Sequence, residues 1–76
     1  MKPIPDNIRY GKYRHFKGGM YELISVARDS ENPDNLLAVY RALYGEGELW
    51  VRPLDMFFET VLRGGERILR FTYCEE

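Results

Sequence analysis

Apolar and polar residues along this chain form short runs that glycine-rich or polar segments interrupt. The apolar runs are rich in Tyr, Phe, Leu, Ile and Val, which favour extended strands, and no run keeps a helical period beyond one turn. The segments between them are dense in Gly, Asn, Asp and Pro, which are typical of turns. The pattern predicts strands at residues 12–16, 20–28, 36–44, 49–52, 58–62 and 68–73.

One helical turn is expected between Pro53 and Phe57. Proline cannot donate to a sheet ladder, so it ends the preceding strand, and it suits the first position of a helix. Residues 1–10, with Pro3 and Pro5, are expected to form an irregular arm. Short strands, tight hairpins and a helical turn before a late strand predict a mainly all-β fold, a small SH3-like barrel of about five or six strands.

Size and composition narrow the function classes. The 76 residues predict a single domain over 1–76 with a thin core. The net charge of -1 supplies no global field for nucleic acid or anionic membranes, and the one cysteine excludes an internal disulfide framework. No stretch approaches the ~20 apolar residues of a membrane span. We therefore expect a cytoplasmic protein without membrane association.

The turn at residues 45–48 sets the expected pairing of its flanking strands. If it is tight, Arg41 lies opposite Arg52, and two like charges in direct opposition require a neutralising anion. Glu22 or Glu59 can supply that anion internally. A bound carboxylate or phosphate can also supply it, because two guanidiniums form a bidentate clamp.

The same register assigns side chains to the two faces of the sheet. It places Trp50 on the face opposite to Tyr40 and Tyr44, which argues against an aromatic cage formed by these three rings. Neither face is plainly polar. This is explained either by strands that bend within a small barrel or by a face that meets a partner, such as a second copy of the chain.

A basic and aromatic segment precedes the first glycine-rich turn. No acidic residue lies between Asp6 and Glu22, and the segment contains Arg9, Lys12, Arg14 and Lys17 interleaved with Tyr10, Tyr13, His15 and Phe16. Such a segment fits single-stranded nucleic acid, because cations follow phosphates and aromatic rings stack on bases. It equally fits a strand whose water-facing positions are filled by lysine and arginine.

His15 is the only histidine of the chain. As a general base it requires an orienting carboxylate, for which Glu22 and Glu59 are the candidates. One histidine and one cysteine far apart make a poor metal site, and no phosphate-binding or dinucleotide-binding motif is present. The sequence therefore predicts neither a metal nor a cofactor.

Four segments resemble a bacterial family, the domain of unknown function numbered 1653. They are YRHFKGG at residues 13–19, VYRALYG at 39–45, LWVRPL at 49–54 and MFFE at 56–59. The resemblance implies a bacterial cytoplasmic protein and is compatible with an SH3-like barrel. It implies no established activity and no functional residues.

The sequence favours a non-enzymatic binding module for an anionic ligand or a partner protein. Alternatives are a single-stranded nucleic-acid-binding domain and a small enzyme that uses His15, and a homodimer is compatible with all of them. The candidate ligand-binding residues are Tyr13, Arg14, His15, Lys17, Arg41, Trp50 and Arg52.

Overall fold

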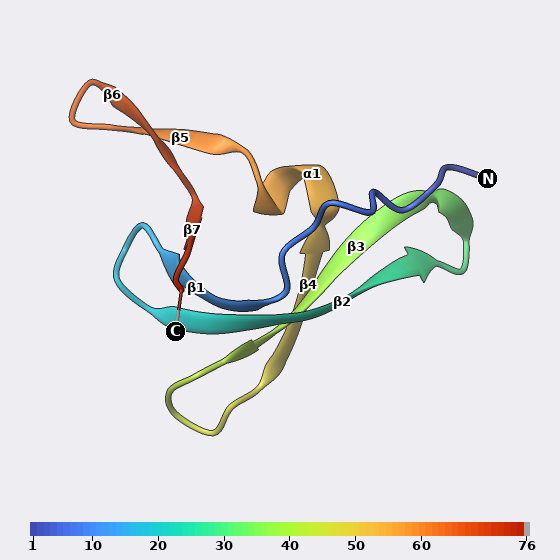
Figure 1. The fold of residues 1–76 in the computed structure, drawn as a ribbon, viewed down its shortest axis with the longest axis horizontal. Coiled ribbons are helices and arrows are strands. Elements are labelled where there is room, and N and C mark those ends of the chain that lie inside the picture. Colours follow the sequence, from blue (N-terminus) through green and yellow to red (C-terminus); the bar gives the residue numbers. More distant parts are fainter. Residues whose placement is uncertain (76) are drawn as a thin grey trace.

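The computed structural model describes residues 1–75 and shows antiparallel strands in two sheets and one short helix (Figure 1). The elements in chain order are β1 (Gly11–His15), β2 (Met20–Asp29), β3 (Asn32–Ala42), β4 (Leu49–Pro53), α1 (Leu54–Phe57), β5 (Thr60–Arg63), β6 (Glu66–Leu69) and β7 (Phe71–Tyr73). The expectation of a mostly β protein with one helical turn is confirmed.

The strands belong to two sheets. The larger sheet has the order β4-β3-β2-β1-β7, and β5 pairs with β6 in a separate hairpin that extends away from it (Figure 1). Within residues 1–75 no ladder joins the edge strands β4 and β7, so the barrel that the sequence predicted is not confirmed. The predicted strand at 68–73 divides at Arg70, whose N–H bonds the carbonyl of Glu59 while its own carbonyl accepts the N–H of Phe16.

An aromatic core fills the concave side of the large sheet. Phe57 of α1 is fully buried and stacks on Phe71 of β7, with ring centroids 4.1 Å apart and planes 6° from parallel. The edges of Tyr13 and Tyr40 each approach Phe57 at 5.3 Å. This cluster joins the two edges of the sheet through side chains instead of through hydrogen bonds.

α1 covers the open side of this core. The sequence predicted Pro53 as the first helical residue, whereas the structure places it at the N-cap. Leu54 and Phe57 point into the core because residues three apart share a helix face. Residues 1–10, which form neither helix nor strand, pass beside the helix (Figure 1). The backbone N–H of Lys2 donates to Asp34, and Arg28 donates to the carbonyl of Lys2, so this arm is fixed at its start.

The predicted pairing of β3 with β4 is wrong. Arg41 lies opposite Leu49 instead of Arg52, and Arg52 lies opposite Ala38. The connecting loop is longer than a tight turn, because the N–H of Ala42 bonds the carbonyl of Glu48 and Arg41 Nη1 donates to Gly47. The two arginines therefore lie on opposite faces of the sheet and cannot repel each other as direct neighbours.

The observed register also moves Trp50. It lies opposite Tyr40, so both side chains point to the concave face. The prediction that Trp50 and Tyr40 lie on opposite faces of the sheet is therefore wrong.

We expect Phe57→Ala to lower the free energy of unfolding by about 3–5 kcal/mol, because it leaves a cavity at the centre of the aromatic core. Urea denaturation monitored by circular dichroism measures this change. Phe58→Ala is the matched control. Phe58 is 37% exposed, so this substitution should lower the free energy of unfolding by a clearly smaller amount. Equal losses for the two variants would show that the Phe57–Phe71 stack is not the centre of the core.

Candidate functional site

A shallow hollow lies on the concave face beside the free edge of β4. It has a volume of 220 Å³ and is lined by Tyr21, Tyr40, Trp50 and Arg52, and we name it the aromatic hollow. Tyr40 is buried and meets the ring of Tyr21 edge-on at 5.5 Å, whereas Trp50 is 49% exposed. A half-exposed indole beside packed tyrosines offers a flat surface for a ring-shaped ligand.

Tyr44 extends the aromatic hollow from the loop after β3. Its hydroxyl is hydrogen-bonded to that of Tyr21, and its ring is more than half exposed. Gly19 allows this arrangement, because a Cβ atom there would lie 3.3 Å from ring carbons of both tyrosines. The hydrogen bond to Tyr44, with a smaller effect of burial, raises the pKa of Tyr21 to about 12, so this hydroxyl stays uncharged at neutral pH.

Arg52 brings positive charge to the same surface. Its Nε donates to the hydroxyl of Tyr40 over 3.3 Å, and its Cζ lies 5.9 Å from the ring centroid of Phe71. None of the carboxylates in the described part of the chain forms an ion pair with it. Because Phe71 belongs to β7, this side chain reaches across the open seam between the two edge strands.

His15 lies next to Arg52 at the end of β1. Its ring is 4.9 Å from that of Phe71, and its Nδ1 accepts the backbone N–H of Lys17. Burial, followed by the positive charges of Arg52, Arg70 and Lys17, lowers the pKa of His15 below its ordinary value of 6.5. His15 is therefore mainly neutral at pH 7 in a positively charged environment.

A second hollow of 330 Å³ lies on the other side of His15, and we name it the cationic hollow. The basic side chains of Arg14, Lys17 and Arg63 line it together with Phe16. Lys17 Nζ and Arg63 Cζ lie 5.8 and 5.7 Å from the ring centroid of Phe16. Arg63 also donates to the carbonyl of Phe16, which ties the β5–β6 hairpin to the β1–β2 turn.

The candidate ligand-binding residues predicted from the sequence lie at different places in the structure. Trp50 and Arg52 line the aromatic hollow, and Arg14, His15 and Lys17 line the cationic hollow. Tyr13 is a buried core residue, and Arg41 lies on the convex face.

Sequence reasoning missed Tyr21 as a site residue and dismissed Tyr40 and Tyr44. The missing information was the register of β3 and β4: once Trp50 is placed opposite Tyr40, alternation alone brings these rings to one face.

Neither of the two carboxylates that are candidates to orient His15 in an enzyme contacts it. Glu22 lies opposite Arg41 on the convex face, and Glu59 Oε1 is 2.9 Å from Arg70 Nη2. Among residues 1–75, no three His, Cys, Asp or Glu side chains are grouped so that they could hold a metal ion. No helix in this part of the chain has the length and apolar character needed to cross a bilayer.

Comparisons with known proteins identify relatives of this chain. A family model described as "Protein of unknown function (DUF1653)" matches residues 11–73. A crystal structure of a DUF1653 protein from Bordetella bronchiseptica is 36% identical in sequence and superimposes with a TM-score of 0.79, covering 90% of this chain and 88% of that one. No protein with a curated description matches the chain.

We expect the pKa of His15 to rise in Arg52→Gln, because one of the charges that disfavours the imidazolium is removed. It should stay below 6.5, since burial is the larger cause of the depression. Proton NMR of the ring across pH 4–9 measures both values. An unchanged pKa in the variant would mean that Arg52 does not act on His15.

The lowered pKa of His15 also makes the free energy of unfolding depend on pH. Because the folded-state pKa lies below the unfolded one, the unfolded chain binds more protons, and the contribution of His15 to the free energy of unfolding falls as pH drops below about 6.5. His15→Gln should remove this contribution from the pH dependence.

Proposed function

The chain belongs to the DUF1653 family, and we propose that it is a non-enzymatic binding module whose ligand is an anion that carries a flat ring. The proposal depends on one observation: the guanidinium of Arg52, without an ion pair to a described carboxylate, lies beside the half-exposed ring of Trp50 in a concave aromatic surface.

The charge of the surface selects the ligand class. An aromatic cage without a charged wall suits a cation, because ring faces are electron-rich. Here Arg52 disfavours a cation, and Tyr21 keeps its proton and adds no negative charge. The combination therefore favours a ring stacked on Trp50 with an anionic group at Arg52.

The size of the surface indicates the strength of binding. The aromatic hollow, at 220 Å³, lies below the ~300–1,000 Å³ typical of pockets that enclose a small molecule. A ligand therefore lies against this surface instead of being enclosed by it. We expect moderate affinity that depends on a few contacts.

We expect adenosine monophosphate to shift the amide and indole NMR signals of the aromatic hollow, with adenosine alone binding more weakly because it lacks the anion. Arg52→Gln should weaken the binding of adenosine monophosphate about tenfold, the usual size of a lost charged hydrogen bond.

Arg67→Gln is the matched control, because it removes the same charge from the β5–β6 hairpin, where Arg67 donates to Thr60 and does not line the aromatic hollow. Both variants must keep the wild-type amide spectrum away from the substituted strand. Equal effects of the two substitutions, or no shifts at the aromatic hollow, would contradict the proposal.

A second candidate is a single-stranded nucleic acid, and the cationic hollow is the observation that favours it. His15 lines the cationic hollow and lies within electrostatic reach of both Lys17 and Arg52, which lines the aromatic hollow. A chain of nucleotides can place bases on exposed rings and phosphates at successive cations along such a surface.

The nucleic-acid candidate predicts binding that weakens with salt. Fluorescence anisotropy with labelled RNA of about eight nucleotides should give an affinity that falls with ionic strength, and Lys17→Gln should lower the logarithmic salt slope by about 0.7, the value for one phosphate contact on a single strand. Lys2→Gln, on the N-terminal arm, should leave the slope unchanged. Salt-independent affinity would exclude this candidate.

A further inference from the structure

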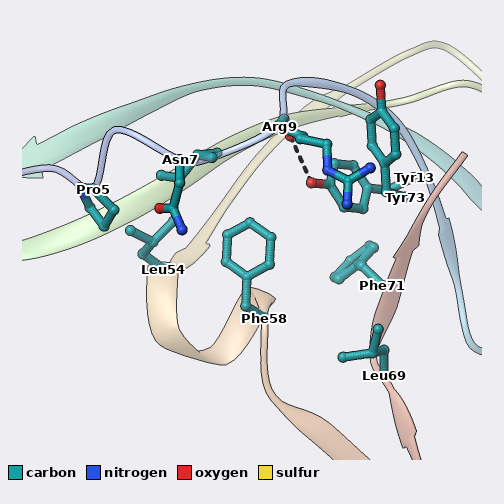
Figure 2. A pocket seen from close by; sticks show the side chains of 10 residues that line it. Pro5, Asn7, Arg9, Tyr13, Leu54, Phe58, Leu69, Phe71 and Tyr73 are labelled. Atoms are coloured by element: carbon teal, nitrogen blue, oxygen red, sulfur yellow. Dashed lines mark hydrogen bonds between the residues drawn. The ribbon is translucent and has the colours of Figure 1, made fainter. Parts of the chain in front are cut away.

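A third hollow, of 360 Å³, lies between the N-terminal arm, α1 and β7 (Figure 2). Its walls are largely apolar and include Ile8, Leu54, Phe58, Leu69 and Phe71. Polar side chains enter it from the arm, where Asn7 and Arg9 line the rim (Figure 2). We name it the arm hollow. None of the residues that line the aromatic hollow takes part in it.

The position of Arg9 is fixed from both ends. Its carbonyl oxygen accepts a 2.6 Å hydrogen bond from the hydroxyl of Tyr13, a core residue that is 4% exposed. Its guanidinium lies over the ring of Tyr73, with Cζ 4.7 Å from the centroid. The arm is therefore attached to the core at the residue that carries the charge.

The guanidinium of Arg9 is available to a ligand. Apart from the contact with the ring of Tyr73, its N–H donors make no hydrogen bond to another described residue. Arg9 is exposed and makes no ion pair with a carboxylate in the described part of the chain. The side-chain amide of Asn7, which is turned toward the hollow in Figure 2, has no described hydrogen-bond partner and offers a further donor.

We propose that the arm hollow binds a small aromatic carboxylate. The carboxylate lies at Arg9, whose fork of N–H donors matches two carboxylate oxygens, and the ring lies against Phe58 and the neighbouring apolar wall.

The dimensions of the arm hollow limit its ligand. Its volume of 360 Å³ is at the small end of the ~300–1,000 Å³ range of ligand pockets, which favours a single ring with a short acidic side chain. Rings at its wall, those of Phe58, Phe71 and Tyr73, can contact a bound ring edge-to-face. This site is independent of the proposed function, because it uses other residues and another ligand.

The test is a titration of the ¹⁵N-labelled chain with phenylacetate. Acetate, which has the charge without the ring, and 2-phenylethanol, which has the ring without the charge, are the matched probes. We expect amide shifts confined to the arm, α1 and the segment at residues 69–73. Phenylacetate should bind about tenfold more tightly than either probe, because only it makes both kinds of contact.

Two variants test the geometry. Arg9→Gln should weaken phenylacetate binding about tenfold, whereas Lys2→Gln, which removes a charge from the same arm outside the arm hollow, should leave it unchanged. Leu69→Trp should block binding by filling the hollow, and its unchanged amide spectrum elsewhere would show that it folds.

Three outcomes would overturn the proposal: no localised shifts, equal affinity for the wild type and Arg9→Gln, or shifts at Trp50 and Arg52 instead. The last would assign the anion to the aromatic hollow and leave the proposed function standing. Binding of phenylacetate at the arm hollow without binding of adenosine monophosphate at Trp50 would support the arm hollow and contradict the proposed function.

Discussion

The stack of Phe57 on Phe71 is the contact on which the rest of the structure depends. Phe71 belongs to the edge strand β7, and Phe57 belongs to the helix that follows the opposite edge strand, β4. A chain of 76 residues buries little surface, so it cannot rely on a large core to hold two unpaired edges in place. Here the aromatic stack brings the edges together across the concave face, and α1 covers what a closed barrel would have enclosed.

The open seam explains where the candidate sites are. Because no backbone ladder joins β4 to β7 in residues 1–75, side chains from the two edges meet in the gap between them, as Arg52 does when it lies over Phe71. On the other side of the core, the N-terminal arm covers the space between α1 and β7 only in part, which leaves the arm hollow. Both hollows thus result from a sheet that curls without closing.

The strands and the helical turn could be predicted from sequence because they depend on local patterns: alternation, turn residues and Pro53. The register of β3 and β4 could not, since it depends on the carbonyl of Gly47 accepting Arg41 and the carbonyl of Glu48 accepting the N–H of Ala42. A shift of three residues moves Trp50 and Arg52 to the other face. The sequence therefore indicated two residues of the aromatic hollow but grouped Arg52 with the wrong partner. The division of the last predicted strand at Arg70 likewise depends on contacts distant in sequence.

The charges around His15 add a second argument for an anionic ligand. Arg52 and Lys17, without ion pairs to described carboxylates, lie close enough to lower the pKa of His15, while Arg70 has its carboxylate in Glu59. Because His15 is mainly neutral at pH 7, Arg52 and Lys17 do not repel it there, and their charges remain available to an anion. The chain contains 12 acidic residues, more than its 11 lysines and arginines. None of the described carboxylates nevertheless forms an ion pair with Arg52 or Lys17. An anion that binds these cations in the folded state would stabilise the fold by mass action. Arg52 and Lys17 are thus the groups that would give such a ligand both affinity and selectivity for an anion.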